Sequence, residues 1–304
     1  MVDDVIEVDD LVKFYDGRCV LDGVNLKVPR GCIYGLLGRN GSGKTTMIRI
    51  LLGLEPPTRG RTAVLGQDST DLPAKVQGKI GYVAEGHQLI QSYRVRRLID
   101  LCRGLSLQWN DKFFAQLMET FRLPMDRRVR DLSAGMRAQL NLALAMAIDP
   151  ELLILDDPTL GLDTVVRRQF IELAIDVIQR QGRTILFSSH ILADVERIAD
   201  RVGILFGGKL AVDCALEELK ERVRKLRVIF PGPAPEELYL TEIIRQQVRG
   251  REMILTVANW NPQKRAILDT FGPEDCTEVP MTLEDIFIEC TRPVSAAVPQ
   301  ESEV

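Results

Sequence analysis

The feature that most constrains this chain is a glycine-rich loop placed between an apolar segment and a helical one. Residues 38–46 read Gly-Arg-Asn-Gly-Ser-Gly-Lys-Thr-Thr and match the pattern Gly-x-x-x-x-Gly-Lys-Thr. Residues 32–37 form a short apolar run, typical of a buried parallel strand, and residues 44–54 have helical periodicity. Backbone N–H groups and a helix N-terminus meet at such a loop and together bind phosphate. The sequence therefore predicts a nucleoside triphosphate site in an α/β fold.

Each residue type in this loop suits a phosphate ligand. The glycines let successive backbone N–H groups point inward, and Lys44 is expected to reach the β- and γ-phosphates. The Thr45 hydroxyl is expected to bind Mg²⁺. The predicted nucleotide contacts in the loop are Gly38, Asn40, Gly41, Ser42, Gly43, Lys44, Thr45 and Thr46.

Strand-like and helix-like segments alternate along the first two-thirds of the chain. Residues 5–14 and 20–28 show partial alternation of apolar and polar side chains, which predicts antiparallel strands joined by a turn at 16–17. Further strands are expected at 80–83, 152–155, 184–188 and 202–206. Helices are expected at 94–147, with a break near Pro124, and at 165–181, ending at Gly182. The stretch at 55–70 is rich in turn residues. The pattern predicts an α/β fold with a mainly parallel core sheet, an antiparallel β subdomain and an α-helical subdomain at about residues 90–150.

The character of the sequence changes near Leu219. A basic stretch at 220–227 and the breaker cluster Pro-Gly-Pro-Ala-Pro at 231–235 come first. After them lie a strand-like segment at 254–257 and helix-like segments at 264–270 and 283–290, which indicate a separate unit. We expect a first domain at 1–219, a small α+β appendage at 220–292 and a disordered tail at 293–304.

Two carboxylates end the apolar strand expected at 152–155. Buried like charges raise each other's pKa, so Asp156 and Asp157 favour a divalent cation at this position. Asp156 is the expected Mg²⁺ partner, with a water between them, and Asp157 is expected to position or deprotonate an attacking water. Taken alone, such a pair also fits a helix cap. His190 follows the strand at 184–188, where open α/β sheets place ligands, and a γ-phosphate contact is expected.

A second candidate anion site lies at residues 132–136, which read Leu-Ser-Ala-Gly-Met just before an apolar helix. Ser133 and Gly135 offer a hydroxyl and exposed N–H groups at a helix N-terminus. An isolated stretch of this kind would be a plain serine N-cap. Two phosphate-binding elements of different type on one chain suggest one nucleotide held between two subunits.

Composition limits the classes of partner. The net charge of −4 over 304 residues gives no general attraction to nucleic acid, and none is expected as a partner. The acidic start of the chain argues against a secretory signal, and the densest apolar stretch, 140–148, is too short to span a bilayer. If the protein works at a membrane, another chain must supply the spanning helices. The six cysteines are scattered, and no two of them form a C-x-x-C pattern. This favours reduced thiols over a disulfide or zinc framework.

The ordered set of glycine-rich loop, Leu-Ser-x-Gly, apolar-Asp-Asp-Pro and histidine resembles the nucleotide-binding subunit of ATP-binding-cassette transporters, over about residues 5–215. The resemblance implies a P-loop NTPase cassette that binds ATP with Mg²⁺. It implies that Tyr15 stacks on adenine and that Glu85, in the stretch 80–85, belongs to a Mg²⁺- and coupling-linked catalytic loop. It also implies a head-to-tail dimer, in which Asp163 lies in the interface loop and Ser133 and Gly135 cap the ATP of the other subunit.

Three positions depart from the family pattern. The signature has Ala134 and Met136 where Gly and Gln are usual, although Ser133 and Gly135 remain. Position 85 is Glu where Gln is usual. Asp157 stands where the family usually has the catalytic Glu, and its side chain is shorter by one carbon–carbon bond, roughly 1.5 Å. We therefore expect slow hydrolysis and a long-lived ATP-bound dimer.

The resemblance implies an ATP hydrolase that drives a separate polytopic membrane subunit from the cytoplasmic face of the membrane. Residues 283–287 look similar to the C-terminal regions of exporter-type cassettes, so export is favoured over import. The second nucleotide-binding subunit could be identical or different. Two alternatives stay open. One is a soluble ATP-switched protein associated with nucleic acid or ribosomes, and the other is a regulatory ATP-binding module with little turnover.

Overall fold

The computed structural model describes residues 4–86, 88–179, 183–236, 238 and 240–291. The expected tail at 293–304 and the helix stop at Gly182 lie outside these residues. The chain divides into two compact units between Asp213 and Cys214, slightly before the change of character near Leu219. Each unit is described by itself below.

The centre of the first unit is a six-stranded sheet in the order β10-β9-β3-β8-β7-β6. Neighbours from β9 to β6 are parallel, as expected. Every residue of β3, β7 and β8 is buried, which explains their nearly continuous apolar sequences. The strands are β3 (Ile33–Leu37), β6 (Ile80–Val83), β7 (Leu152–Asp156), β8 (Thr184–Ser189), β9 (Arg201–Phe206) and β10 (Lys209–Ala215). The α/β fold with a mainly parallel core sheet is confirmed.

A second, antiparallel sheet in the same unit has the order β2-β1-β4-β5. The expected pair at 5–14 and 20–28 is confirmed as β1 (Asp4–Tyr15) and β2 (Arg18–Pro29). The turn-rich interpretation of 55–70 is wrong, because β4 (Arg59–Val64) pairs with β1 and β5 (Gln67–Asp68) pairs with β4. The polar sequence of β4 hid this strand, which long-range pairing to β1 stabilises.

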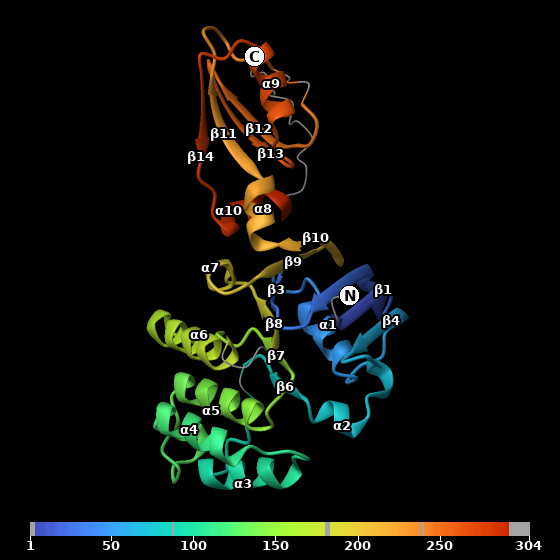
Figure 1. Cartoon of the computed structure of the whole chain (residues 1–304), viewed down its shortest axis with the longest axis vertical. Coiled ribbons are helices and arrows are strands. Elements are labelled where there is room, and N and C mark those ends of the chain that lie inside the picture. The colour runs from blue at the N-terminus through green and yellow to red at the C-terminus, as the bar shows by residue number, and fades with distance from the viewer. Residues whose placement is uncertain (1–3, 87, 180–182, 237, 239, 292–304) are drawn as a thin grey trace, which may run out of the picture. The chain divides into compact units, whose positions relative to one another are not determined.

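The helical region expected at 94–147 is three helices with two breaks rather than one. Asn110 causes the additional break, since its side chain accepts a hydrogen bond from Phe113 N and caps a new helix. Figure 1 shows the three helices gathered as one group. They are α3 (Val95–Leu105), α4 (Asp111–Phe121) and α5 (Ala134–Ala147). The other helices of this unit are α1 (Lys44–Leu51), α2 (Ala74–Gln77), α6 (Thr164–Gln179), α7 (Leu192–Glu196) and the 3₁₀ turns η1 (Ser69–Asp71) and η2 (Val129–Asp131).

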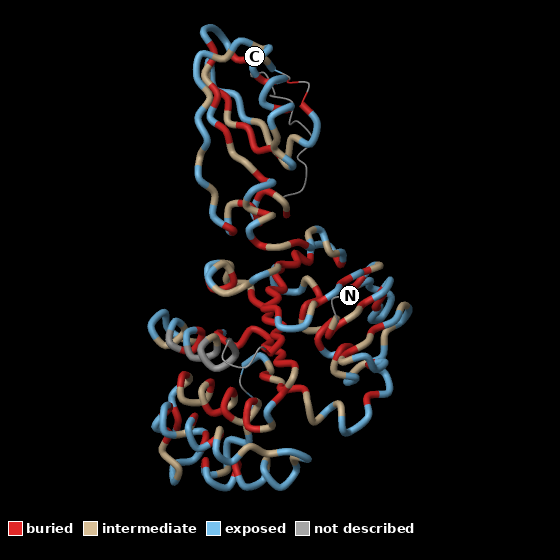
Figure 2. Tube along the Cα trace, in the orientation of Figure 1, coloured by how far each residue is buried: buried red, intermediate tan, exposed pale blue. Residues whose placement is uncertain are grey.

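One apolar cluster joins the two sheets of the first unit through α1. Met47, Ile48, Ile50 and Leu51 of α1 are fully buried in it, together with residues of β1, β2 and the central strands. In Figure 2 the buried trace follows these central strands. The helix that follows the glycine-rich loop is therefore held rigidly, which fixes the loop at its N-terminus.

The second unit is a four-stranded antiparallel sheet in the order β12-β13-β11-β14 with its own apolar core. The strand expected at 254–257 and the helices expected at 264–270 and 283–290 are confirmed, but three strands were not anticipated. The basic stretch at 220–227 contains the end of a helix and the start of a strand. The strand was not recognised because only Leu226 and Val228 in it are buried. The elements are α8 (Leu216–Arg222), β11 (Arg224–Ile229), β12 (Ile243–Arg249), β13 (Glu252–Val257), α9 (Pro262–Thr270), β14 (Asp275–Val279) and α10 (Leu283–Thr291).

Within the described parts of the chain, none of the helices combines the length and the apolar character needed to cross a membrane. All six cysteines are free thiols.

Candidate nucleotide-binding site

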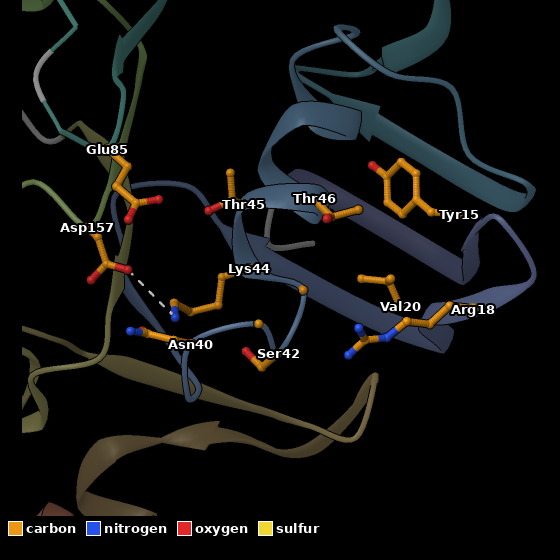
Figure 3. Close-up of a pocket in the computed structure, with 12 residues that line it drawn as sticks. Tyr15, Arg18, Val20, Asn40, Ser42, Lys44, Thr45, Thr46, Glu85 and Asp157 are labelled. Atoms are coloured by element: carbon orange, nitrogen blue, oxygen red, sulfur yellow. Dashed lines mark ion pairs between the residues drawn. The ribbon is translucent and has the colours of Figure 1, made fainter.

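A cavity of about 520 Å³ lies over the glycine-rich loop and receives side chains from three parts of the first unit. Figure 3 shows the loop and the start of α1 between the end of β1 and the segments that follow β6 and β7. The lining residues are Tyr15, Arg18, Val20, Asn40, Gly41, Ser42, Gly43, Lys44, Thr45, Thr46, Glu85 and Asp157. Ten of these twelve are residues that the sequence singled out.

Sequence reasoning missed Arg18 and Val20. Both belong to the start of β2, and the β1–β2 hairpin brings them to the cavity beside Tyr15. Their only sequence signal is that they follow the Asp-Gly turn of this hairpin. Arg18 places a cation at the cavity, at the end away from Asp157 (Figure 3).

The loop has the conformation that its glycines permit. Gly43 caps α1 with φ of 108°, a left-handed value that favours glycine. At Gly38 a Cβ atom would lie 2.3 Å from Ser42 Oγ and 2.8 Å from the Leu205 carbonyl oxygen, so only glycine fits. No side chain caps α1, and its first N–H groups are available to an anion.

Lys44 lies at the floor of the cavity with its side chain folded over the loop. Its side chain is 5% exposed, and Nζ donates a hydrogen bond of 2.9 Å to the Gly38 carbonyl oxygen. Nζ also lies 3.7 Å from Asp157 Oδ2, the ion pair marked in Figure 3. This ammonium is the kind of group that neutralises phosphate charge in a buried site.

Asp156 ends β7 with a fully buried carboxylate that is only half satisfied. Its Oδ1 accepts hydrogen bonds from Ser188 Oγ at 2.7 Å and Thr45 Oγ1 at 3.3 Å. Its Oδ2 is buried without a hydrogen-bond partner. Burial is the main cause that raises the pKa of this carboxyl above its ordinary value.

The unsatisfied oxygen of Asp156 and the adjacent Thr45 hydroxyl fit Mg²⁺, which prefers hard oxygen ligands. The described residues contain no cluster of three or more His, Cys, Asp or Glu side chains that could hold a metal. A cation here would therefore take its remaining ligands from phosphate oxygens and water, as Mg²⁺ commonly does.

Asp157 and His190 form a close pair at the ends of the neighbouring strands β7 and β8. Asp157 Oδ1 lies 2.7 Å from His190 Nδ1 and also accepts a hydrogen bond of 3.2 Å from the His190 backbone N–H. Asp157 has φ of 41°, in the left-handed region, and its own N–H donates to Ser188 Oγ at 3.0 Å. One carboxylate therefore contacts both the imidazole and Lys44.

Glu85 follows β6 and also lines the cavity, since β6 lies beside β7 in the sheet. In Figure 3 its carboxylate points toward the same space as Asp157. Three acidic side chains, Glu85, Asp156 and Asp157, thus come to the carboxyl ends of two adjacent parallel strands, where α/β sheets bind ligands.

Six predicted site residues do not line this cavity. Gly38, Asp156 and His190 each contact a residue that does. The other three, Ser133, Asp163 and Gly135, have contacts elsewhere. Ser133 caps α5, since its Oγ accepts a hydrogen bond of 3.2 Å from Met136 N. Asp163 Oδ1 accepts hydrogen bonds of 3.0 Å from the backbone N–H groups of Val165 and Val166 at the start of α6. A Cβ atom on Gly135 would lie 2.5 Å from Val166 Cγ1, so this glycine allows α5 and α6 to approach.

Comparison with known proteins agrees with this geometry. The family model of the ABC transporter matches residues 21–160. The ABC transporter ATP-binding protein YtrB of Bacillus subtilis (strain 168) is 32% identical over 93% of this chain and 97% of its own length. This chain belongs to the ABC transporter ATP-binding proteins.

Other ABC relatives span most of the chain. The Nod factor export ATP-binding protein I of Neorhizobium galegae is 34% identical over 94% of this chain and 84% of its own length. The bacitracin transport ATP-binding protein BcrA of Bacillus licheniformis is 34% identical over 73% of each chain. A solved ATP-binding subunit of an ABC transporter superposes with a TM-score of 0.64 and 30% identity, over 71% of this chain and 92% of that structure. The cavity therefore occurs in an ABC cassette fold.

Proposed function

We propose that this ABC subunit binds ATP with Mg²⁺ in the cavity over residues 38–46, hydrolyses it, and drives a separate polytopic membrane subunit. The observation that carries the proposal is the convergence of Lys44, Asp157, His190 and the unsatisfied Asp156 carboxylate at the loop. A buried cation, an acid–imidazole pair and a metal-competent carboxylate together are the parts that phosphoryl transfer to water requires.

Each of these side chains has a distinct task in the proposal. The loop N–H groups and Lys44 bind the phosphates, and Tyr15 stacks on adenine at the other end of the cavity. Thr45 and Asp156 hold Mg²⁺, with Glu85 near it, and the ion neutralises phosphate charge when bound. Asp157 accepts the proton of the attacking water, and His190 contacts the γ-phosphate. Because Asp157 is shorter than Glu, hydrolysis is slow.

The positions of Ser133, Gly135 and Asp163 support a head-to-tail dimer. They lie outside the cavity of their own chain. Ser133 nevertheless stands at the N-terminus of a 14-residue helix, where anions are favoured. We propose that these residues close on ATP held by the loop of a second nucleotide-binding subunit, identical or different.

Export is the proposed direction of transport, and the cytoplasmic face of the membrane is the proposed location. Relatives that match 94% of this chain include a protein named for Nod factor export. Residues 1–213 would form the ATP-binding unit and residues 214–291 the appendage. The α3–α5 group would meet the membrane subunit, because Leu105 and Leu107 expose large apolar surfaces at the end of α3.

The proposal is tested with the tagged full-length chain purified from its native membranes and with its ATPase activity. We expect a polytopic membrane protein to co-purify, and we expect Mg²⁺-dependent ATP hydrolysis that Lys44→Ala reduces at least roughly 100-fold, as loss of a preorganised transition-state contact does. Co-purification with ribosomes or nucleic acid, without a membrane protein, would overturn the transport role.

A further inference from the structure

The side chain of Tyr15 contacts Thr46, which lines the cavity, and two groups outside the cavity. Its hydroxyl donates a hydrogen bond to Glu55 Oε2, and Lys13 Nζ lies 4.9 Å from the ring centroid. Tyr15 lines the cavity, whereas Lys13 and Glu55 do not. Tyr15 is still 38% exposed, which leaves surface on which a planar group can stack.

Glu55 is held in turn by two cations from different elements. Its Oε1 lies 3.3 Å from Arg49 Nη1, and its Oε2 lies 3.8 Å from Lys13 Nζ. Arg49 belongs to α1, the helix that begins at the phosphate loop. Lys13 belongs to β1, and its Nζ also donates a hydrogen bond of 2.8 Å to the Pro56 carbonyl oxygen. The side chain of Glu55 is only 24% exposed, so water screens these contacts in part.

This network joins the two ends of the cavity. α1 places Lys44, Thr45 and Thr46 at the phosphate end, and the end of β1 places Tyr15 at the other. Glu55 contacts both Arg49 of α1 and Tyr15 of β1, and Thr46 in the first turn of α1 also hydrogen bonds with the Tyr15 hydroxyl. Burial, and then the hydrogen bond to Glu55, raise the pKa of Tyr15, which keeps its hydroxyl a neutral donor.

We propose that Glu55 is a positioning residue for the nucleotide base: it holds the Tyr15 ring at a set place relative to the phosphate loop. This inference rests on the proposed ATP site. Without the carboxylate, the Tyr15 side chain gains rotamer freedom that base stacking must then remove. The affinity for the triphosphate does not depend on Glu55, because Lys44 and the loop N–H groups bind the phosphates.

Separate ligands for the two ends of the cavity test this assignment on the full-length protein. We would measure dissociation constants of ATP and of inorganic tripolyphosphate, which has no base, by calorimetry with Mg²⁺. For Glu55→Ala we expect ATP to bind about five-fold more weakly, the effect of one net hydrogen bond, and tripolyphosphate affinity to stay within about two-fold. Glu119→Ala, which removes an exposed carboxylate on α4, is the matched control and should change neither constant.

Tyr15→Phe completes the test, since it keeps the ring and deletes the hydroxyl that Glu55 accepts from. If Glu55 acts through Tyr15, the double variant Tyr15→Phe/Glu55→Ala binds ATP about as weakly as Glu55→Ala alone. In steady-state assays KM for ATP should rise by a larger factor than kcat falls. Equal losses for ATP and tripolyphosphate, an unchanged ATP constant in Glu55→Ala, or full additivity would overturn the assignment. If Glu55→Ala does not fold, an ATP constant unchanged in Tyr15→Phe would overturn it.

The same measurements separate this inference from the proposed function. A wild-type chain that binds neither ATP nor tripolyphosphate contradicts the ATP site itself, and the role of Glu55 falls with it. A wild-type chain that binds both, with Glu55→Ala indistinguishable from it, contradicts only the role of Glu55.

Discussion

At the scale of single residues, Asp157 determines how the cavity is arranged. Its two carboxylate oxygens face different partners, His190 Nδ1 at 2.7 Å and Lys44 Nζ at 3.7 Å. The left-handed backbone at φ of 41° turns this short side chain toward both of them. A glutamate at the same position would extend about one carbon–carbon bond further into the cavity, roughly 1.5 Å.

Substituting Asp157→Glu should therefore increase steady-state ATPase activity, because the acid would come closer to the attacking water. We expect a rise in kcat of roughly ten-fold or more, since displacements of about 1 Å can change rates by two orders of magnitude. The measurement is phosphate release from the purified full-length protein, with Asp157→Asn as the inactive reference. Activity equal to or below that of the wild type would contradict slow hydrolysis caused by the shorter acid.

Much of this residue-level chemistry could be predicted from sequence, because it depends on neighbours in the chain. The glycines, Lys44 and Thr45 act within one continuous loop, so their pattern already carried the function. The pairing of Asp157 with Lys44 and His190 could not be predicted, since it joins residues far apart in the chain across three parallel strands. The packing of Gly135 against Val166 was likewise hidden, and it gives this glycine a structural role as well.

At the scale of elements, one carboxylate ties together the segments that lead into three strands of the central sheet. Glu151 precedes β7, and its carboxylate pairs with Lys79, which precedes β6, at 2.6 Å. It also pairs with Arg30, between β2 and β3, at 3.2 Å. These contacts lie at the amino ends of the parallel strands, opposite the carboxyl ends that form the cavity. They support the sheet without touching the ligand site.

The stability contributed by Glu151 should depend on pH. The hydrogen bond from Lys79, and then the contact with Arg30, hold the pKa of Glu151 below its ordinary value of 4.5. A lowered pKa in the folded state means that the stabilisation is present above about pH 4.5 and is lost as pH falls through the folded value. Because the side chain is 39% exposed, we expect Glu151→Gln to cost only about 0.5 kcal/mol at pH 7.

Thermal unfolding of the full-length protein checks this value. Glu151→Gln should lower Tm by about 1–2 °C at pH 7, and the difference from the wild type should shrink as pH falls from 4.5 through the folded pKa of Glu151. A difference that persists unchanged in acid would show that packing, and not the ion pairs, accounts for it.

The pattern of apolar residues predicted an element correctly where one face or the whole of that element is buried. β3, β7 and β8 are apolar throughout because both faces of a parallel sheet are covered, and they were found from sequence. β4 was missed because its stability comes from pairing with β1, far away in the chain, and not from its own polar sequence. The appendage strands β11, β12 and β14 were missed for the same reason.

At the scale of the whole molecule, two candidate phosphate-binding elements lie on one chain and only one of them lines the cavity. Ser133 caps α5 with its hydroxyl and is not a lining residue. In the proposed head-to-tail dimer, each Ser133 would face the ATP of the other subunit. ATP would then hold the two chains together, and its hydrolysis would release them.

The dimer is tested in a variant that retains ATP. Asp157→Asn removes the proton acceptor, and light scattering after gel filtration with ATP and Mg²⁺ should show a doubled mass at micromolar protein. With ADP, the same variant should stay monomeric. Adding Ser133→Arg to this variant should prevent ATP-dependent dimerisation, because the larger side chain would not fit at the contact between the two subunits. A monomer in ATP would exclude the homodimer.

The sequence by itself determined the ligand chemistry of this protein: a phosphate loop after a buried strand, acids at a strand end, and a helix N-cap signature. These are local patterns, and local backbone preference and side-chain chemistry suffice to specify them. Only the tertiary structure decided which groups meet. It brought Arg18 and Val20 to the cavity, tied Glu55 to Tyr15 and left one Asp156 oxygen unsatisfied, since such contacts arise from packing between segments that the chain order separates. Above all, it placed residues 40–46 at the cavity and Ser133 outside it.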